Sequence, residues 1–131
     1  MTVKLNHTIV HSRDPRAAAD FFSGLFGLPA PVPFGPFLVV ELDNDVSLDF
    51  HSLDEHEMQV IASQHYAFLV NDDEWDAILA RVVARGLDYW ADPGKGQAGQ
   101  VNDHDGGKGV YFEDPDGHFL EIITRPYGSG G

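Results

Sequence analysis

Cysteine is absent from this 131-residue chain, and basic residues are scarce. The absence of thiols excludes disulfides, thiolate nucleophiles and thiolate metal ligands, so any metal site must use nitrogen and oxygen ligands. Only 8 Lys and Arg residues stand against 21 Asp and Glu residues, which gives a formal net charge of −13. Such a surface repels phosphate backbones and anionic lipids, so we expect neither nucleic acid nor a membrane as a partner.

Long hydrophobic runs are also missing. No apolar stretch approaches the ~20 residues that a membrane-spanning helix needs, and the N-terminal residues lack the charged-then-apolar order of a secretory signal. A cytoplasmic location is therefore expected. The chain does contain 43% hydrophobic residues, enough to bury one core of ordinary size.

The first half of the chain begins with a predicted strand and helix. Residues 5–10 are rich in β-branched types, which favours a strand. Asp14 and Pro15 suit the N-cap and the first position of a helix that ends near Gly27. The apolar residues of that helix recur at helical spacing; they are Ala18, Phe21, Phe22 and Leu25.

The same order returns in the second half. Residues 65–70 predict a strand, and Asn71 with Glu74 three positions later resembles a capping box at a helix start. His65 follows His7 by 58 positions. Because both halves repeat one plan at that interval, we interpret the chain as an internal duplication.

Shorter strand candidates follow each predicted helix. In the first half they are residues 37–42 and 46–51, joined by a turn at residues 43–45. In the second half they are residues 88–91, 109–113 and 119–124, with a tight turn at residues 114–117 between the last two. The stretches 29–36 and 92–108 are expected to be irregular loops.

Three polar residues stand out on the predicted strands. His7 and His65 occupy matching places in the two halves, and Glu121 lies inside the apolar run Phe-Leu-Glu-Ile-Ile. A carboxylate there faces either water or a polar cavity, because burying it unpaired is costly. Strand histidines are often structural groups, so the pattern leaves both interpretations open. If the three meet, two imidazoles and a carboxylate suit one divalent Fe, Mn, Zn, Ni or Co ion and leave coordination positions for a substrate.

Four segments of the chain carry a family resemblance: residues 5–10, 21–28, 65–70 and 111–122. Together they resemble the vicinal oxygen chelate superfamily, which includes glyoxalase I, extradiol dioxygenases, fosfomycin-modifying thiol transferases and bleomycin resistance proteins. The resemblance extends over residues 4–126. It implies an α+β fold of two tandem βαβββ modules, residues 1–60 and 61–126, whose curved mixed sheet surrounds a central cavity. The pattern of the residues after Pro126 separately predicts a flexible tail at residues 127–131.

The same resemblance implies a site and an activity. His7, His65 and Glu121 would bind one divalent metal ion, and the protein would be a homodimer. The implied function is that of a metal-dependent enzyme of the glyoxalase or dioxygenase type, with the metal as a Lewis acid toward a small molecule with neighbouring oxygens. The alternatives are an extradiol ring-cleaving dioxygenase that uses Fe(II), and a non-catalytic drug-binding protein like the bleomycin resistance proteins. Binding-only members usually lack the three ligands, so their presence favours an enzyme.

Three further residues are candidates for catalysis. Asp49 stands near the place of the fourth metal ligand of glyoxalase I and shares a predicted strand face with His51. His104 lies in a glycine-rich stretch that is either a lid carrying an acid or base, or a plain solvated loop. Tyr111 is a candidate partner for a substrate hydroxyl. Fosfomycin thiol transferases carry a catalytic Thr two residues after the first His, and Ile9 at that place argues against their reaction.

Overall fold

The chain forms two compact units. A computed structural model describes residues 2–52 and 60–130, and its contacts divide the chain into unit 1, Met1–Ile61, and unit 2, Ala62–Gly131. Each unit is described by itself. Both contain a strand, a helix and then three strands, so the predicted α+β fold with tandem βαβββ modules is confirmed.

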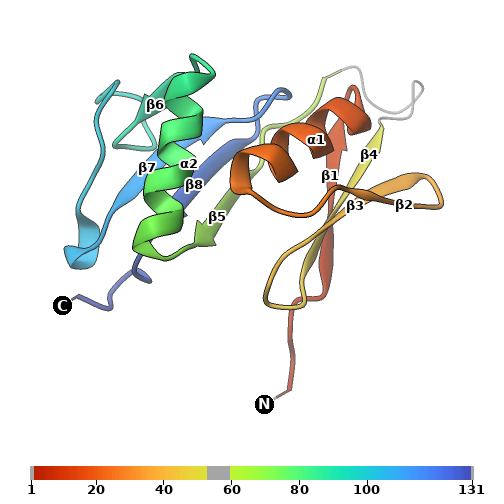
Figure 1. Ribbon diagram of the computed structural model, residues 1–131, viewed down its shortest axis with the longest axis horizontal. Coiled ribbons are helices and arrows are strands. Elements are labelled where there is room, and N and C mark those ends of the chain that lie inside the picture. The colour runs from red at the N-terminus through yellow and green to blue at the C-terminus, as the bar shows by residue number, and fades with distance from the viewer. Residues whose placement is uncertain (1, 53–59, 131) are drawn as a thin grey trace. The chain divides into compact units, whose positions relative to one another are not determined.

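Unit 1 is a four-stranded mixed sheet with one helix against it (Figure 1). Its elements are β1 (His7–Ser12), α1 (Pro15–Phe26), β2 (Val32–Phe34), β3 (Phe37–Glu41) and β4 (Ser47–Ser52). The strand order is β1-β4-β3-β2, in which β1 runs parallel to β4 and the other neighbours are antiparallel.

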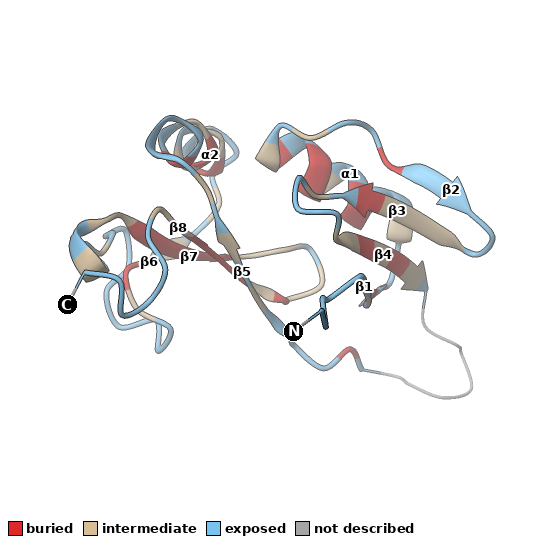
Figure 2. Cartoon of the chain, turned by 90° about the horizontal axis from the view of Figure 1, so that it is seen from below, coloured by how far each residue is buried: buried red, intermediate tan, exposed pale blue. Residues whose placement is uncertain are grey.

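The ends of α1 are set by the residues that the sequence singled out. The Asp14 carboxylate accepts a hydrogen bond from the backbone N–H of Ala17 at 3.1 Å, and Pro15 occupies the first turn. Gly27 ends the helix in the left-handed conformation, at φ 69°, where a residue with a Cβ would be strained. The buried side of α1 faces the sheet (Figure 2).

Strand β2 differs from the sequence expectation. It lies within residues 29–36, which we expected to be an irregular loop and which contain four prolines. Val32 nevertheless pairs with Val39 of β3 in an antiparallel ladder. β2 is the outermost strand of its sheet, and an edge position tolerates a proline such as Pro33, which has no N–H to donate.

Unit 2 repeats this architecture. Its elements are β5 (His65–Leu69), α2 (Asp72–Ala84), β6 (Tyr89–Trp90), a 3₁₀ turn η1 (His104–Gly106), β7 (Gly109–Glu113) and β8 (Phe119–Ile123). The strand order is β5-β8-β7-β6, and β5 runs parallel to β8. The Trp75 indole N–H donates to the Ile122 carbonyl at 3.2 Å, which ties α2 to β8.

Burial fixes which face of each sheet is turned toward its helix. In β4, Leu48 and Phe50 are buried while the alternate residue Asp49 is half-buried on the other face. In β8, Leu120 and Ile122 belong to the core. Each such side chain stabilises the fold by roughly 1.5–3 kcal/mol, so a one-residue slip in register would be severely penalised. The faces away from the helices are therefore fixed as well.

Within residues 2–52 and 60–130, no helix combines the length and the apolar character that crossing a bilayer requires.

Candidate active site

Unit 2 brings together two of the three predicted metal ligands. Parallel pairing of β5 and β8 sets His65 opposite Phe119 and Ala67 opposite Glu121. The His65 Nε2 atom then lies 3.1 Å from the Glu121 Oε1 atom. Glu121 is 1% exposed, whereas the His65 side chain is 49% exposed. The pair therefore consists of a buried carboxylate and an imidazole that is accessible from solvent.

The other ring nitrogen of His65 determines the chemistry of this pair. Its Nδ1 atom lies 2.9 Å from the carbonyl oxygen of Phe119. A carbonyl oxygen only accepts, so Nδ1 carries the proton and Nε2 of the neutral ring has a lone pair. Two acceptors, Nε2 and Oε1, then face each other and need a cation, either a proton or a metal ion. A backbone carbonyl that holds the far nitrogen of a ligating His is the usual arrangement in metal sites.

The separation of the two atoms also fits a metal ion. Nitrogen and oxygen ligands lie about 2.0–2.2 Å from ions such as Zn²⁺. Two neighbouring ligand atoms of one ion are then about 3 Å apart, and the His65 and Glu121 atoms are separated by 3.1 Å. These two residues therefore fit a divalent cation in both chemistry and spacing.

The second oxygen of Glu121 is held by a residue that sequence reasoning missed. The Tyr127 hydroxyl donates to Glu121 Oε2, and the Tyr111 hydroxyl lies 3.1 Å from the Tyr127 hydroxyl. Since the Tyr127 proton is directed at the carboxylate, Tyr111 is the donor in the bond between the two phenols. Burial and the hydrogen bond to Glu121 raise the pKa of Tyr127 far above its usual range. Burial likewise raises the pKa of Tyr111, so both phenols remain donors.

Tyr127 belongs to the segment in which we expected a flexible tail. The only sequence signal for its role is an aromatic residue placed among Pro126, Gly128 and Ser129. Local pattern assigns no partner to such a residue, because the partner lies on β8. Residue 131 of the expected tail lies outside the described residues.

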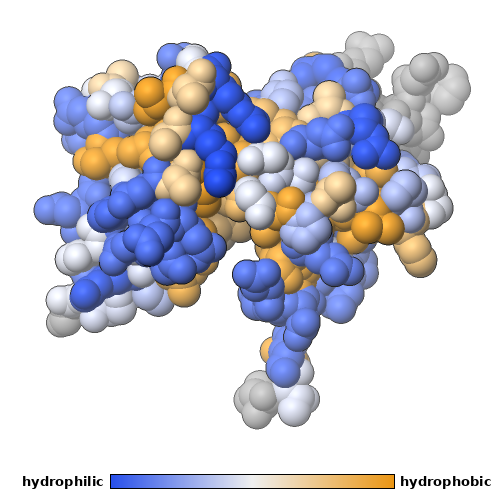
Figure 3. Space-filling view, viewed as in Figure 1, coloured by the Kyte–Doolittle hydropathy of each residue, from blue (hydrophilic) through white to orange (hydrophobic). Residues whose placement is uncertain are grey.

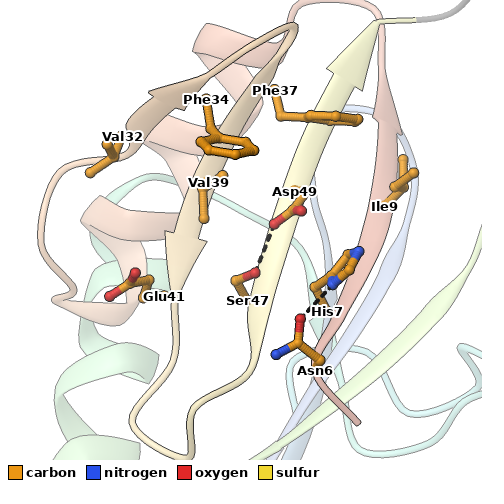
Figure 4. Close-up of a pocket in the computed structure, with 10 residues that line it drawn as sticks. All are labelled: Asn6, His7, Ile9, Val32, Phe34, Phe37, Val39, Glu41, Ser47 and Asp49. Carbon is orange, nitrogen blue, oxygen red and sulfur yellow. Dashed lines mark hydrogen bonds between the residues drawn. The ribbon is translucent and has the colours of Figure 1, made fainter.

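Unit 1 presents His7 in a comparable way. Its Nδ1 atom lies 2.6 Å from Asn6 Oδ1. The amide oxygen only accepts, so Nδ1 carries the proton and the Nε2 lone pair is available. His7 is exposed at the start of β1 and lines a cavity together with Asn6 (Figure 4).

The cavity of unit 1 occupies about 440 Å³ on the sheet face away from α1. Its polar lining comprises Asn6, His7, Glu41, Ser47 and Asp49. Its apolar lining comprises Ile9, Val32, Phe34, Phe37 and Val39. Apolar walls with a few polar groups are the usual composition of small-molecule sites. Val32 and Phe34 of β2 are also strongly exposed. Figure 3 shows hydrophobic residues at the surface of this unit.

The remaining predicted residues are distributed over the two units. Asp49 lines the cavity of unit 1, and its Oδ1 atom accepts a hydrogen bond from the Ser47 hydroxyl at 2.8 Å (Figure 4). Tyr111 of β7 is buried beside Glu121, and its ring stacks on Phe119 at 5.3 Å. His104 is exposed in η1, where its backbone N–H donates to Asn102.

Within residues 2–52 and 60–130, no group of three or more metal-ligating side chains comes together. His7 belongs to unit 1, whereas His65 and Glu121 belong to unit 2. The predicted pair within unit 2 is thus formed, and the three-residue metal site stays a prediction.

Comparison with known proteins adds a family. Residues 4–122 match the family model described as the glyoxalase/bleomycin resistance protein/dioxygenase superfamily. That match covers most of the chain, including His7, His65 and Glu121.

Three similar proteins illustrate the range of the match. The solved structure named oxidase ChaP-H2 is 52% identical, with complete coverage of both chains and a TM-score of 0.94. Oxidase ChaP-H1 is 57% identical, with 97% of this chain and 99% of that chain covered and a TM-score of 0.91. The metallothiol transferase FosB of Shouchella clausii is 28% identical over 92% of this chain and 79% of that protein. All three names denote enzymes.

Proposed function

The chain belongs to the glyoxalase/bleomycin resistance protein/dioxygenase superfamily, and on that premise we propose that it is a divalent-metal-dependent enzyme acting on a small molecule with neighbouring oxygens. The proposal is carried by the His65–Glu121 pair, whose Nε2 and Oε1 atoms lie 3.1 Å apart. His7 is the proposed third ligand, because its Nε2 lone pair is likewise available. The proposed assembly is a homodimer.

Oxidation is the reaction that we favour. Two relatives at 52% and 57% identity over nearly the whole chain carry the name oxidase. Their similarity far exceeds that of the metallothiol transferase at 28%. Two imidazoles and a carboxylate with open positions are the ligands that non-haem Fe(II) oxygenases use. We therefore propose Fe(II) as the metal and dioxygen as the oxidant.

Different residues are proposed to bind the metal, to exclude water and to accept a proton. His65 and His7 are the proposed imidazole ligands, each with its Nδ1 atom held by a backbone or amide oxygen, and Glu121 is the proposed carboxylate ligand from a buried position. A divalent cation held by these three residues would supply Lewis-acid stabilisation of negative charge on substrate oxygens. The apolar wall of the unit 1 cavity excludes water from the hydrocarbon part of the substrate. Asp49, whose Oδ1 atom accepts from the Ser47 hydroxyl in the unit 1 cavity, is the proposed acceptor of a proton from a substrate hydroxyl.

Metal analysis and oxygen uptake test this proposal. Protein purified without oxygen should contain iron, and it should consume dioxygen when a catechol is supplied as the probe. His65→Ala and Glu121→Gln should lose both properties, whereas His104→Ala should keep the iron. Turnover of a glutathione hemithioacetal with nickel, zinc or manganese would assign glyoxalase chemistry to the protein and overturn the proposed oxidation. A protein that takes up none of the five candidate metals would overturn the proposal altogether.

A further inference from the structure

The C-terminal segment of unit 2 reaches the proposed metal ligand Glu121. Tyr127 is 57% exposed as a whole residue, yet its hydroxyl donates to Oε2 of a carboxylate that is 1% exposed. Tyr111 donates in turn to Tyr127. The buried carboxylate thus has a different partner on each oxygen, with Oε1 facing His65 and Oε2 facing a phenol.

The segment that carries Tyr127 is anchored at one acidic residue. The two carboxylate oxygens of Asp105 accept hydrogen bonds from the backbone N–H groups of Gly128, at 3.1 Å, and Gly130, at 3.2 Å. Asp105 itself lies in η1 with a φ of 57°, in the left-handed region. A Cβ at Gly130 would come within 2.3 Å of the Asp105 carbonyl oxygen, so the two backbones meet closely only because that residue is glycine.

The segment is also closed on itself. The Ser129 hydroxyl donates to the Pro126 carbonyl at 2.6 Å, and the Ser129 backbone N–H donates to the same oxygen at 3.2 Å. Tyr127 therefore projects from a turn that is fixed by its own hydrogen bonds and by Asp105. A phenol presented in this way reaches Glu121 in a defined position.

We propose that Tyr127 is a positioning residue that holds Glu121 with only Oε1 turned toward the cation, and that Asp105 anchors the segment that carries it. This inference rests on the proposed metal-dependent function. A carboxylate can bind an ion through one oxygen or through both. A donor on Oε2 withholds that oxygen, which preserves open coordination positions for the two substrate oxygens. The same donor fixes the rotation of the carboxylate, as outer partners of metal ligands do.

Cobalt(II) alone is a suitable probe, because its visible absorption reports the number and arrangement of its ligands. In Tyr127→Phe the Glu121 carboxylate loses the partner that fixes its rotation, so we expect Co²⁺ affinity to fall roughly tenfold or more. We also expect the visible absorption to weaken as both carboxylate oxygens bind and the coordination number rises. Asp105→Ala keeps the phenol but removes its anchor, and it should shift both readouts in the same direction by a smaller factor.

Tyr89→Phe is the matched control. Tyr89 of β6 pairs with Phe112 of β7, so it lies on the sheet face opposite Tyr111 and Glu121. The Co²⁺ affinity and visible spectrum of Tyr89→Phe should equal those of the wild type. Circular dichroism should confirm the fold of each variant. If the wild type binds no Co²⁺, the proposed function and this inference both fall. If it binds Co²⁺ and Tyr127→Phe matches it, the inference alone is overturned. If Tyr127→Phe differs from the wild type but Asp105→Ala does not, the anchoring role of Asp105 is overturned.

Discussion

Asp114 holds the turn between β7 and β8 through its side chain. Its Oδ1 atom accepts hydrogen bonds from the backbone N–H groups of Asp116, at 2.9 Å, and His118, at 2.8 Å. Burial raises the pKa of this carboxyl above the ordinary 3.8, although the backbone hydrogen bond from His118 and the nearby imidazole act in the opposite direction. The turn that positions Glu121 on β8 is therefore built around an acid whose ionisation the fold disfavours.

This raised pKa makes a prediction for Asp114→Asn. In the wild type the folded state binds the Asp114 proton more tightly than the unfolded state. The corresponding stability is present at low pH and is lost as the pH rises through the folded-state pKa. Asn keeps the Oδ1 acceptor but does not ionise. The stability of the variant relative to the wild type should therefore increase from about pH 4 to about pH 7.

Urea unfolding at a series of pH values measures this difference. Asp88→Asn, an exposed residue outside the turn, serves as the control and should track the wild type at each pH. A difference between Asp114→Asn and wild type that stays constant or shrinks with rising pH would contradict the account.

Single residues also mark the limit of what pattern can predict. Alternation along the two predicted strands assigns His65 and Glu121 each to one strand face. This assignment is compatible with the observed register, in which Ala67 lies opposite Glu121. His118, beside the turn residues Asp116 and Gly117, is interpreted from sequence as a surface residue. It is instead 1% exposed, and its Nδ1 atom accepts from the backbone N–H of Gln64, 54 positions earlier. Such a contact depends on tertiary packing and leaves no local signal.

At the scale of elements, the start of α2 is the feature best specified by local chemistry. The Glu74 backbone N–H donates to the Asn71 side chain at 2.8 Å, and the Asn71 backbone N–H donates to the Glu74 carboxylate at 3.2 Å. The capping box read from the sequence is thereby confirmed. It orients the helix whose Trp75 is bonded to β8, the strand that carries Glu121.

Removal of this cap should destabilise unit 2. Asn71→Ala leaves a helix N–H without its partner, and we expect a loss of about 1 kcal/mol in the free energy of unfolding. Urea denaturation followed by Trp fluorescence measures the change. Asn71→Asp retains the acceptor and should lose much less, which separates the capping hydrogen bond from general effects of substitution. Equal losses in the two variants would exclude the cap as the cause.

Elements were harder to predict where their stability is not local. β2 is a three-residue edge strand in a proline-rich stretch, and it forms because the backbone of β3 provides hydrogen-bond partners along that edge. β6 contains only Tyr89 and Trp90, two residues of the four predicted, because its partner strand β7 determines its length. In contrast, both helices have capping residues and apolar stripes from which their ends can be predicted. Helix bounds are thus encoded locally, whereas short strands are decided by their neighbours.

At the scale of the whole molecule, the proposed metal site draws on both repeats of the duplication. His7 is supplied by unit 1, and the His65–Glu121 pair by unit 2. A cation that binds only the folded protein stabilises it by an amount set by its concentration and affinity, about 2.7 kcal/mol at 100 times the dissociation constant. If His7 binds the cation as proposed, that stabilisation depends on His7 as well as on His65 and Glu121.

We therefore expect one pattern of thermal shifts. Addition of Co²⁺ should raise the melting temperature of the wild type, and a chelator should reverse the rise. His7→Ala should abolish the rise as fully as His65→Ala, although the two residues belong to different units. The side chain of His7 is exposed, so its removal should leave the melting temperature of the metal-free protein nearly unchanged. His11→Ala, on the same strand as His7, should retain the full Co²⁺ response. If His7→Ala responds to Co²⁺ like the wild type while His65→Ala does not, the cation is bound by unit 2 alone and His7 is not a ligand.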